Sequence, residues 1–264
     1  MPKEKNLKKV KVAVLYSGGL DSAITIKLLE REGVAVIPLH IATPFRMISK
    51  KKIAQMLDVL GYKLRYVELG GEYIETIKKP KHARLGCGLL DQYENKSDLG
   101  IGLNNAYPCI DCKIFMLKAA WKYCRENGID FIAMGDVFGQ WPDQTMMTLI
   151  DNEAGVTGYV LRPLCAKLLE PTRPEIKKVV NRNHFFAFSG TDRQYQLKLA
   201  RKLKIDAASL DPVSGGCLLT NPAFCRELNG TIEKRKKITQ TTIEKTKSKL
   251  AATRELTCQN GVWR

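Results

Sequence analysis

Residues 10–22 read VKVAVLYSGGLDS, and this stretch decides the fold of the chain. Residues 10–16 form a nearly continuous apolar run, which is typical of a strand buried on both faces of a parallel sheet. From Asp21 to Glu32 the apolar residues recur at helical spacing, and Gly33 follows as a helix stop. The turn SGGLDS at 17–22 therefore joins a buried strand directly to a helix.

Strand and helix patterns continue to alternate along the chain with short connections. Strands are predicted at 34–42, 63–69 and 130–135, and helices at about 48–60 and 112–127. Such alternation favours a parallel sheet covered by helices on both faces. We therefore expect an α/β fold with a doubly wound parallel sheet and a short basic C-terminal extension.

The second half of the chain has a less regular pattern. The runs at 146–150 and 158–164 predict a hairpin-like pair of strands, and 185–190 predicts one more strand. Thr172 and Pro174 predict a helix start, and 192–205 predicts a basic amphipathic helix. After Asp211 the sequence is turn-rich, and the tail from 231 is rich in Lys and Thr.

The net charge of +16 is concentrated in three segments. Residues 1–11 carry five lysines and one acid, 171–204 carry nine basic and two acidic residues, and 231–264 carry nine basic and three acidic residues. Basic segments on a near-neutral body favour binding of a polyanion such as RNA, whereas solubilising tails are the alternative reading of the two ends. The polyanion-binding face is predicted to be formed by Arg173, Lys177, Lys178, Arg182, Arg193, Lys198, Arg201 and Lys202.

The turn SGGLDS has the composition of an anion-binding site. Two glycines let the backbone approach an anion closely, and Ser17 and Ser22 can donate hydrogen bonds without bulk. The following helix directs its free N–H groups toward the same point, which favours phosphate. The turn lacks the lysine of the common nucleotide-binding P-loop, so it represents another class of phosphate site.

Three of the eight cysteines stand in motifs suited to metal binding. Cys109 and Cys112 form a CxxC immediately before the helix expected at 112–127, and Cys217 lies in a second glycine turn, SGGCLLT at 214–220. Three thiols without a fourth ligand suit a cubane iron-sulfur cluster with one open iron, whereas structural zinc normally takes four ligands. Cys124, Cys165 and Cys225 are expected to be buried or free thiols, and Cys87 in a long loop is either a loop thiol or a sulfur carrier.

SGGLDS matches the SGGxDS loop and resembles the PP-loop family of ATP pyrophosphatases. Together with CIDCKIFM, GDVFGQ (135–140), LRPLCAKLLEPTRPE (161–175) and GGCLLT, it is similar to the compact tRNA thiouridine synthetases of that family. The resemblance spans roughly residues 10–225. It implies an ATP- and Mg²⁺-dependent enzyme that adenylates a uracil oxygen of tRNA and replaces it with sulfur from a 4Fe-4S cluster.

The resemblance also implies roles for individual residues. Ser17, Gly18, Gly19, Asp21 and Ser22 would bind the phosphates, with Asp21 handling magnesium, and Gly135 and Asp136 would help to close the nucleotide site. The resemblance makes Cys109, Cys112 and Cys217 the cluster ligands. A persulfide on one of these cysteines, or a zinc-bearing adenylating or amide-forming ligase, are the alternatives. The sulfur comes from sulfide or a donor protein, and a homodimer is compatible with this reading.

The expected domain organisation has a PP-loop domain at 1–210, with the CxxC loop inserted at 80–112. The GGC turn and the basic extension then occupy 211–264. No apolar run approaches the roughly 20 residues of a membrane-spanning helix, and the lysine-rich start lacks the apolar core of a secretory signal. We therefore expect a cytoplasmic protein with no membrane partner and with reduced cysteines.

Overall fold

The computed structural model describes residues 9–78, 80–82, 108–140, 144–190, 192–210, 217–235, 238–252, 258–259 and 262–263. Its sheet has five parallel strands in the order β3-β2-β1-β4-β5. The strands are β1 (Lys11–Leu15), β2 (Ala35–Ala42), β3 (Arg65–Glu68), β4 (Phe131–Ala133) and β5 (Val160–Leu161). The expected doubly wound α/β fold is confirmed.

The order of the strands reverses between β1 and β4. Val12 pairs with Val36 of β2 on one side and with Phe131 of β4 on the other. In doubly wound sheets, ligands bind where the strand order reverses, beyond the carboxyl ends of the two central strands. SGGLDS follows β1 and Gly135 follows β4, so the topology brings both sequence motifs to this point.

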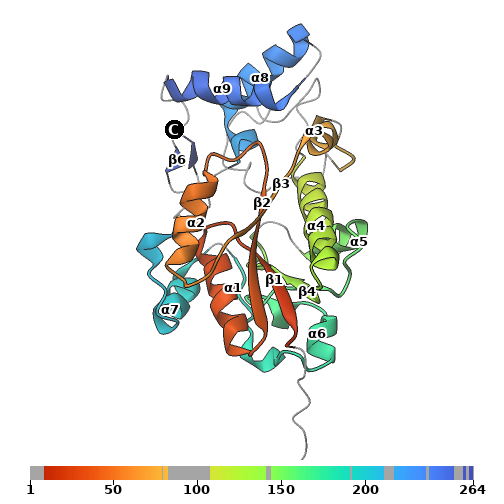
Figure 1. Ribbon diagram of the computed structural model, residues 1–264, viewed down its shortest axis with the longest axis vertical. Coiled ribbons are helices and arrows are strands. Elements are labelled where there is room, and N and C mark those ends of the chain that lie inside the picture. Colours follow the sequence, from red (N-terminus) through yellow and green to blue (C-terminus); the bar gives the residue numbers. More distant parts are fainter. Residues whose placement is uncertain are drawn as a thin grey trace, which may run out of the picture.

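Helices cover both faces of the sheet (Figure 1). One face is covered by α1 (Leu20–Arg31), α2 (Lys50–Asp58) and α7 (Gln194–Lys202), whose buried side chains pack on strand residues such as Val12 and Val14. The other face is covered by α3 (Gly71–Lys78), α4 (Cys109–Glu126) and α5 (Gln144–Glu153), whose buried side chains pack on strand residues such as Ala13. The alternation of side chains along β1 divides the core into these two parts.

The prediction of a hairpin at 146–150 and 158–164 is wrong. Residues 146–150 lie in α5, and β5 pairs with β4 in parallel. Met147, Ile150 and Ala154 are buried at a spacing of three and four residues, which places them on one side of a helix. The apolar content of this stretch suits either structure, and packing against α4 selects the helix.

The strand predicted at 185–190 is also absent. This segment makes only one isolated parallel bridge, between Phe138 and Ser189. It follows the short helix α6 (Arg173–Ile176), where Thr172 is the N-cap as expected and forms a capping box with Glu175. The bridge ties the segment to the chain that continues beyond β4.

The C-terminal part contains more regular structure than its composition indicates. Two helices, α8 (Pro222–Arg235) and α9 (Gln240–Ala252), pack side by side at one end of the molecule (Figure 1), and β6 (Cys258–Gln259) pairs with β7 (Val262–Trp263) antiparallel. Phe224, Leu228 and Ile243 are fully buried and belong to the same core as the α4 face of the sheet. Within the described ranges, no helix is long and apolar enough to span a membrane.

Candidate functional site: a phosphate-binding turn beside a cysteine pair

The SGGLDS turn is ordered by its own hydrogen bonds. Ser22 Oγ donates to the Gly19 carbonyl at 2.8 Å, Ser17 N donates to Ser22 Oγ at 3.3 Å, and Gly19 N donates to Ser17 Oγ at 3.3 Å. Gly18 has a φ of 90°, in the region that favours glycine. The turn therefore arranges small hydroxyls and backbone amides at the start of α1 before any ligand arrives.

Gly135 brings the chain after β4 into backbone contact with this turn. A Cβ atom at Gly135 would lie 2.6 Å from the carbonyl carbon of Asp21 and 2.7 Å from Ser22 N. No side chain can be accommodated there without moving backbone. Gly135 thus acts by permitting the close approach of two chain segments, a role that its position in GDVFGQ did not specify.

Asp21 presents an uncommitted carboxylate oxygen at the site. Its Oδ1 atom is buried and has no hydrogen-bond partner. The pKa of Asp21 is raised to about 6, chiefly by burial, while the charge of Arg193 opposes the rise and that of Asp136 contributes to it. A buried carboxylate oxygen beside a phosphate-binding turn fits a Mg²⁺ ligand, because magnesium binds through one or two carboxylates together with substrate phosphates.

Asp136 is committed to a buried ion-pair network. Lys113 Nζ lies 3.0 Å from its Oδ1, and Arg162 Nε donates to its Oδ2 at 3.1 Å. Burial alone would raise the pKa of Asp136, but the charges of Lys113 and Arg162 outweigh it, and the pKa is lowered. Asp136 therefore stays ionised and contributes negative charge to the site, rather than a free oxygen.

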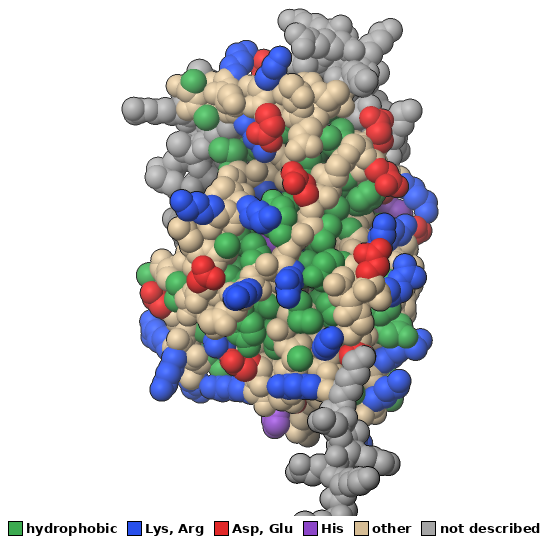
Figure 2. All heavy atoms as spheres, in the orientation of Figure 1, with side chains coloured by type: hydrophobic (Ala, Val, Ile, Leu, Met, Phe, Trp, Pro, Cys, Tyr) green, Lys and Arg blue, Asp and Glu red, His purple; other side chains and the backbone are tan. Residues whose placement is uncertain are grey.

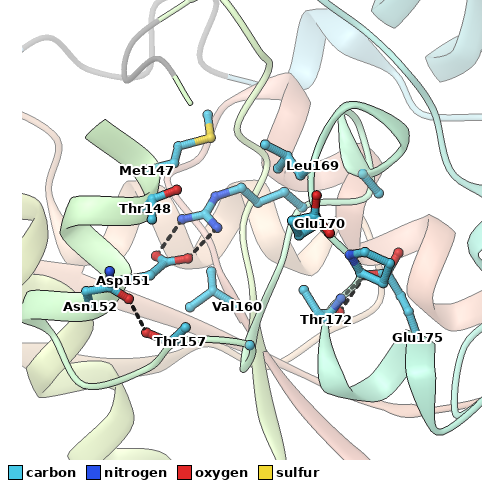
Figure 3. A pocket seen from close by; sticks show the side chains of 14 residues that line it. Met147, Thr148, Asp151, Asn152, Thr157, Val160, Leu169, Glu170, Thr172 and Glu175 are labelled. Atoms are coloured by element: carbon cyan, nitrogen blue, oxygen red, sulfur yellow. Dashed lines mark hydrogen bonds and ion pairs between the residues drawn. The ribbon is translucent and has the colours of Figure 1, made fainter. Parts of the chain in front are cut away.

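Arg162 also links this network to a pocket of about 270 Å³ (Figure 3). Its two terminal nitrogens donate to Asp151 of α5 at 2.7 and 2.8 Å, and the ion pairs raise the pKa of the buried guanidinium. Glu170 and Thr172 line the pocket from the opposite side. The network thus joins α5 to the segment after β4 by paired buried charges.

Cys112, near the N-terminus of α4, lies close to Cys217. Cys109 and Cys112 lie in the first turn of α4, which begins at Cys109, three residues before the predicted start at 112. The Tyr73 hydroxyl lies 3.1 Å from Cys112 Sγ and interacts electrostatically with Cys217 as well. The pKa of Cys217 is raised to about 12, chiefly by burial and also by the nearby Cys112. The pair therefore consists of protonated thiols in the absence of a metal.

The donor set at this position is chemically suited to a thiophilic metal centre. Cys109 precedes Cys112 by one helical turn, so it lies on the same face of α4. As the side chains are placed, no three Cys, His, Asp or Glu groups among the described residues come together as a metal site. The structure thus assembles two thiols, with the third one turn away; Cys87 lies outside the described residues.

The segment after β2 connects the cysteine pair to the phosphate-binding turn. Arg46 forms an antiparallel bridge with Cys217, and its Nη2 donates to the Ser17 carbonyl at 3.4 Å. Leu218 N donates to the Phe45 carbonyl at 2.8 Å, and Lys247 of α9 donates to the Arg46 carbonyl at 3.3 Å. The two motifs therefore belong to one site at the carboxyl edge of the sheet.

The predicted polyanion-binding residues do not form one uniform surface. Arg173, Lys177 and Lys178 are exposed on or beside α6, and Lys198, Arg201 and Lys202 are exposed on α7. Arg193 lies close enough to Asp21 to lower its pKa. Arg182 is held internally by the nearly buried carboxylate of Glu175 at 2.7 Å and by two carbonyl oxygens. Lys and Arg side chains gather along the lower edge of the face shown in Figure 2.

Sequence reasoning missed several residues of this site. Lys113 directly follows the CxxC, and Arg162 lies in a quoted motif, so both carried a signal that was not used. Arg46 and Tyr73 stand in unremarkable stretches, and only the fold brings them to the cysteines. Among the other cysteines, Cys124, Cys165 and Cys225 are buried, as expected.

Comparison with known proteins identifies the family. Residues 8–179 match the family described as "Thiamine biosynthesis protein (ThiI)". The chain belongs to this family. A ThiI-family origin agrees with the observed SGGLDS turn, which occupies the switch point of the sheet.

Curated relatives of this ThiI-family chain are longer proteins. "Probable tRNA sulfurtransferase" from Thermococcus kodakarensis is 32% identical over 157 residues, covering 58% of this chain and 36% of the relative. A protein of the same printed name from Thermoanaerobacter pseudethanolicus is 22% identical over 233 residues, covering 86% of this chain and 50% of the relative. The chain thus spans between about a third and a half of the length of these relatives.

A solved structure shares the fold. The structure described as "Crystal structure of a 4-thiouridine synthetase - RNA complex with bound ATP" superposes with a TM-score of 0.51 and 19% sequence identity. The match covers 92% of this chain and 52% of that chain. The shared region therefore includes the sheet and the helices on both of its faces.

Proposed function

We propose that this protein is an ATP-dependent tRNA sulfurtransferase that forms thiouridine. The observation that carries the proposal is the junction at Arg46, which joins the phosphate-binding turn to the Cys112 and Cys217 pair within one site. Membership of the ThiI family and the printed names of its relatives support the same activity. A protein that only binds a nucleotide would have no need of a cysteine pair beside its phosphate-binding turn.

The proposed first step is adenylation of the substrate. A uracil carbonyl oxygen attacks the α-phosphate of ATP, and pyrophosphate departs. The amides and hydroxyls of SGGLDS hold the departing pyrophosphate, and Asp21 would hold Mg²⁺ through its uncommitted Oδ1 atom. The buried charges around Asp136 keep the site in a fixed geometry, so that orientation supplies part of the rate.

The proposed second step replaces the activated oxygen with sulfur, and AMP departs. Cys109, Cys112 and Cys217 would hold a 4Fe-4S cluster, which, when bound, would present sulfur at its open iron. Tyr73 would donate a hydrogen bond into this sulfur site from its buried hydroxyl. Arg46, which contacts both Cys217 and Ser17, would hold the sulfur site at a fixed distance from the adenylation site.

A second candidate is thiolation through a cysteine persulfide without a cluster. The placement of the Cys112 and Cys217 thiols close to each other supports it, because one could carry the persulfide and the other could resolve it. The terminal persulfide sulfur would displace AMP, and the partner thiol would close a disulfide that an external thiol must reduce. The cluster route can take its sulfur from sulfide, whereas the persulfide route needs a donor protein that already carries persulfide sulfur. The sulfur source, like a homodimer, stays a prediction.

The discriminating experiment is metal analysis after anaerobic purification. Wild type, Cys217→Ala and the control Cys124→Ala, which removes a buried thiol at the far end of α4, are assayed for iron, zinc and acid-labile sulfide. About four irons and four sulfides in wild type and control, lost in Cys217→Ala, support the cluster. Stoichiometric zinc that does not depend on Cys217 would overturn the cluster mechanism and favour a zinc-bearing adenylating ligase.

Activity is measured on an unmodified tRNA transcript with ATP and Mg²⁺, once with sulfide and once with a persulfide donor and an external thiol. Thiouridine is then quantified in the digested RNA. Iron-free protein that still forms thiouridine, with Cys217 required, would select the persulfide route. The sulfurtransferase assignment would be refuted if no thiouridine formed and AMP were released only when a different acceptor was supplied.

A further inference from the structure

A row of three stacked aromatic rings lies beside the candidate site. The Phe186 and Phe188 rings have centroids 4.7 Å apart at 27°, and the Phe188 and Tyr195 rings have centroids 5.8 Å apart at 26°. Phe186 and Phe188 are partly buried on the α1 face of the core, whereas Tyr195 is 59% exposed. We call Phe186, Phe188 and Tyr195 the aromatic row.

The aromatic row is fixed to the edge of the nucleotide site. Phe138 N donates to the Phe188 carbonyl at 3.3 Å, and Gly190 N donates to the Phe138 carbonyl at 2.8 Å. Phe138 belongs to the same stretch as Gly135 and Asp136, which contact and face Asp21. The row therefore extends outward from the carboxyl end of β4.

Tyr195 forms the exposed end of this row. It lies in the first turn of α7 and is 59% exposed, although its ring is large and flat. An aromatic ring pre-ordered by stacking on two further rings loses little conformational entropy when another flat group stacks on it.

The charge around Tyr195 indicates what kind of group binds there. Lys198 Nζ lies 6.0 Å from the Tyr195 ring centroid, and Arg201 and Lys202 are exposed on the same helix. Arg193 lies between Phe188 and Tyr195 in the sequence, and its charge interacts with the Asp21 carboxylate. A flat apolar face bordered by cations is complementary to a base that carries a phosphate on each side.

We propose that the aromatic row is a stacking platform for an unpaired base of the tRNA substrate, with the cations of α7 binding its flanking phosphates. This inference rests on the proposed function, which requires a uracil to leave its helical stack and enter the site. The platform would hold the exposed nucleotide strand beside the adenylation site. Stacking accepts any base, so the row orders the strand without reading its sequence.

The test separates stacking from charge by using two RNA probes. One is a fluorescein-labelled single-stranded oligouridine, and the other has the same length and phosphates but abasic ribose at its central positions. Binding is measured by fluorescence anisotropy, without ATP or a sulfur source. Wild type should prefer the base-bearing probe, and Tyr195→Ala should bind it roughly 5- to 100-fold more weakly, while losing the preference.

Matched variants control for charge and folding. Tyr195→Phe keeps the ring and should retain the preference. Tyr195→Trp should also retain it and gain a tryptophan emission that the base-bearing probe quenches. Lys202→Ala removes an exposed cation on α7 and should weaken both probes equally, with a shallower salt dependence. Thermal melting verifies that every variant folds.

The outcomes are distinct from those that test thiolation. Equal binding of the two probes by wild type, or equal binding by Tyr195→Ala and Tyr195→Phe, would overturn the platform even if thiouridine forms. A base preference that depends on the ring at 195 supports the platform even if the sulfur chemistry proves different. The platform would also be overturned if wild type bound neither of the two probes, or if it did not bind a folded tRNA transcript.

Discussion

Gly135→Ala tests whether contact between β4 and the phosphate-binding turn organises the active site. The added Cβ would meet three backbone atoms, the carbonyl carbon and oxygen of Asp21 at 2.6 and 2.7 Å and Ser22 N at 2.7 Å. Ordinary contacts begin near 3.4 Å, so the two segments must separate by about 0.8 Å. No side-chain rotation can relieve this contact, because all three atoms are backbone.

The expected effect on stability is moderate and the effect on activity is large. Overpacking of this kind costs about 1–3 kcal/mol of unfolding free energy. For a chain of this size, that loss lowers Tm by roughly 2–4 °C per kcal/mol. A displacement near 1 Å in a reacting geometry costs about 100-fold in rate, so ATP-dependent release of pyrophosphate should fall by about that factor.

Gly70→Ala is the matched control. Gly70 lies two residues beyond the end of β3, as Gly135 lies two residues beyond the end of β4, and a Cβ at Gly70 meets nothing within 4 Å. Tm is measured by differential scanning fluorimetry and ATP turnover by release of labelled pyrophosphate. Equal Tm and equal turnover in Gly135→Ala and Gly70→Ala would refute the reasoning.

Three further predictions concern single groups of the site. Burial raises the pKa of Asp21 to about 6, so protonation should weaken Mg²⁺-ATP binding roughly tenfold at pH 5 relative to pH 7, as calorimetry would measure. For the same reason the free energy of unfolding should fall as pH rises from about 4 to 6, and Asp21→Asn should lose both dependences; persistence of either would contradict the raised pKa. Arg162→Ala leaves the buried carboxylates of Asp136 and Asp151 without their cation, so the free energy of unfolding in urea should fall by about 3–5 kcal/mol. The exposed control Lys177→Ala should lower it by less than about 0.5 kcal/mol. Similar losses in the two variants would disprove a structural role of the network. The Tyr73 hydroxyl lowers the pKa of Cys112 and so partly offsets the effect of burial. Tyr73→Phe should therefore slow alkylation of Cys112 in metal-free protein at pH 8. An unchanged alkylation rate would show that the hydrogen bond does not lower this pKa.

Much of the fold follows from local sequence patterns. Buried strands are predicted at β1, β2 and β4 because fully covered parallel strands need continuous apolar runs. The SGGLDS turn is predicted as an anion site because its small residues precede a helix directly. Residues 146–150 and 185–190 were predicted as strands and are not, since short apolar runs satisfy either periodicity until packing partners are present.

The C-terminal helices show the limit of composition as a guide. The tail is rich in Lys and Thr, yet Ile243, Thr246 and Leu250 are buried on one face of α9. A few apolar residues at helical spacing are enough when a neighbouring helix and the α4 core cover them. The division at 210/211 between the PP-loop domain and the extension stays a prediction.

The sequence by itself determined the chemistry available to this protein: an anion-binding turn, a CxxC, a distant third cysteine and excess positive charge. These depend on residue type and on spacing within a few positions, which local physics can evaluate. Only the tertiary structure decided that Arg46 joins the turn to Cys217, that Tyr73 reaches Cys112 and that Gly135 touches Asp21. Each of those contacts joins segments far apart in the chain, and packing of the sheet and its helices, rather than any local pattern, brings them together.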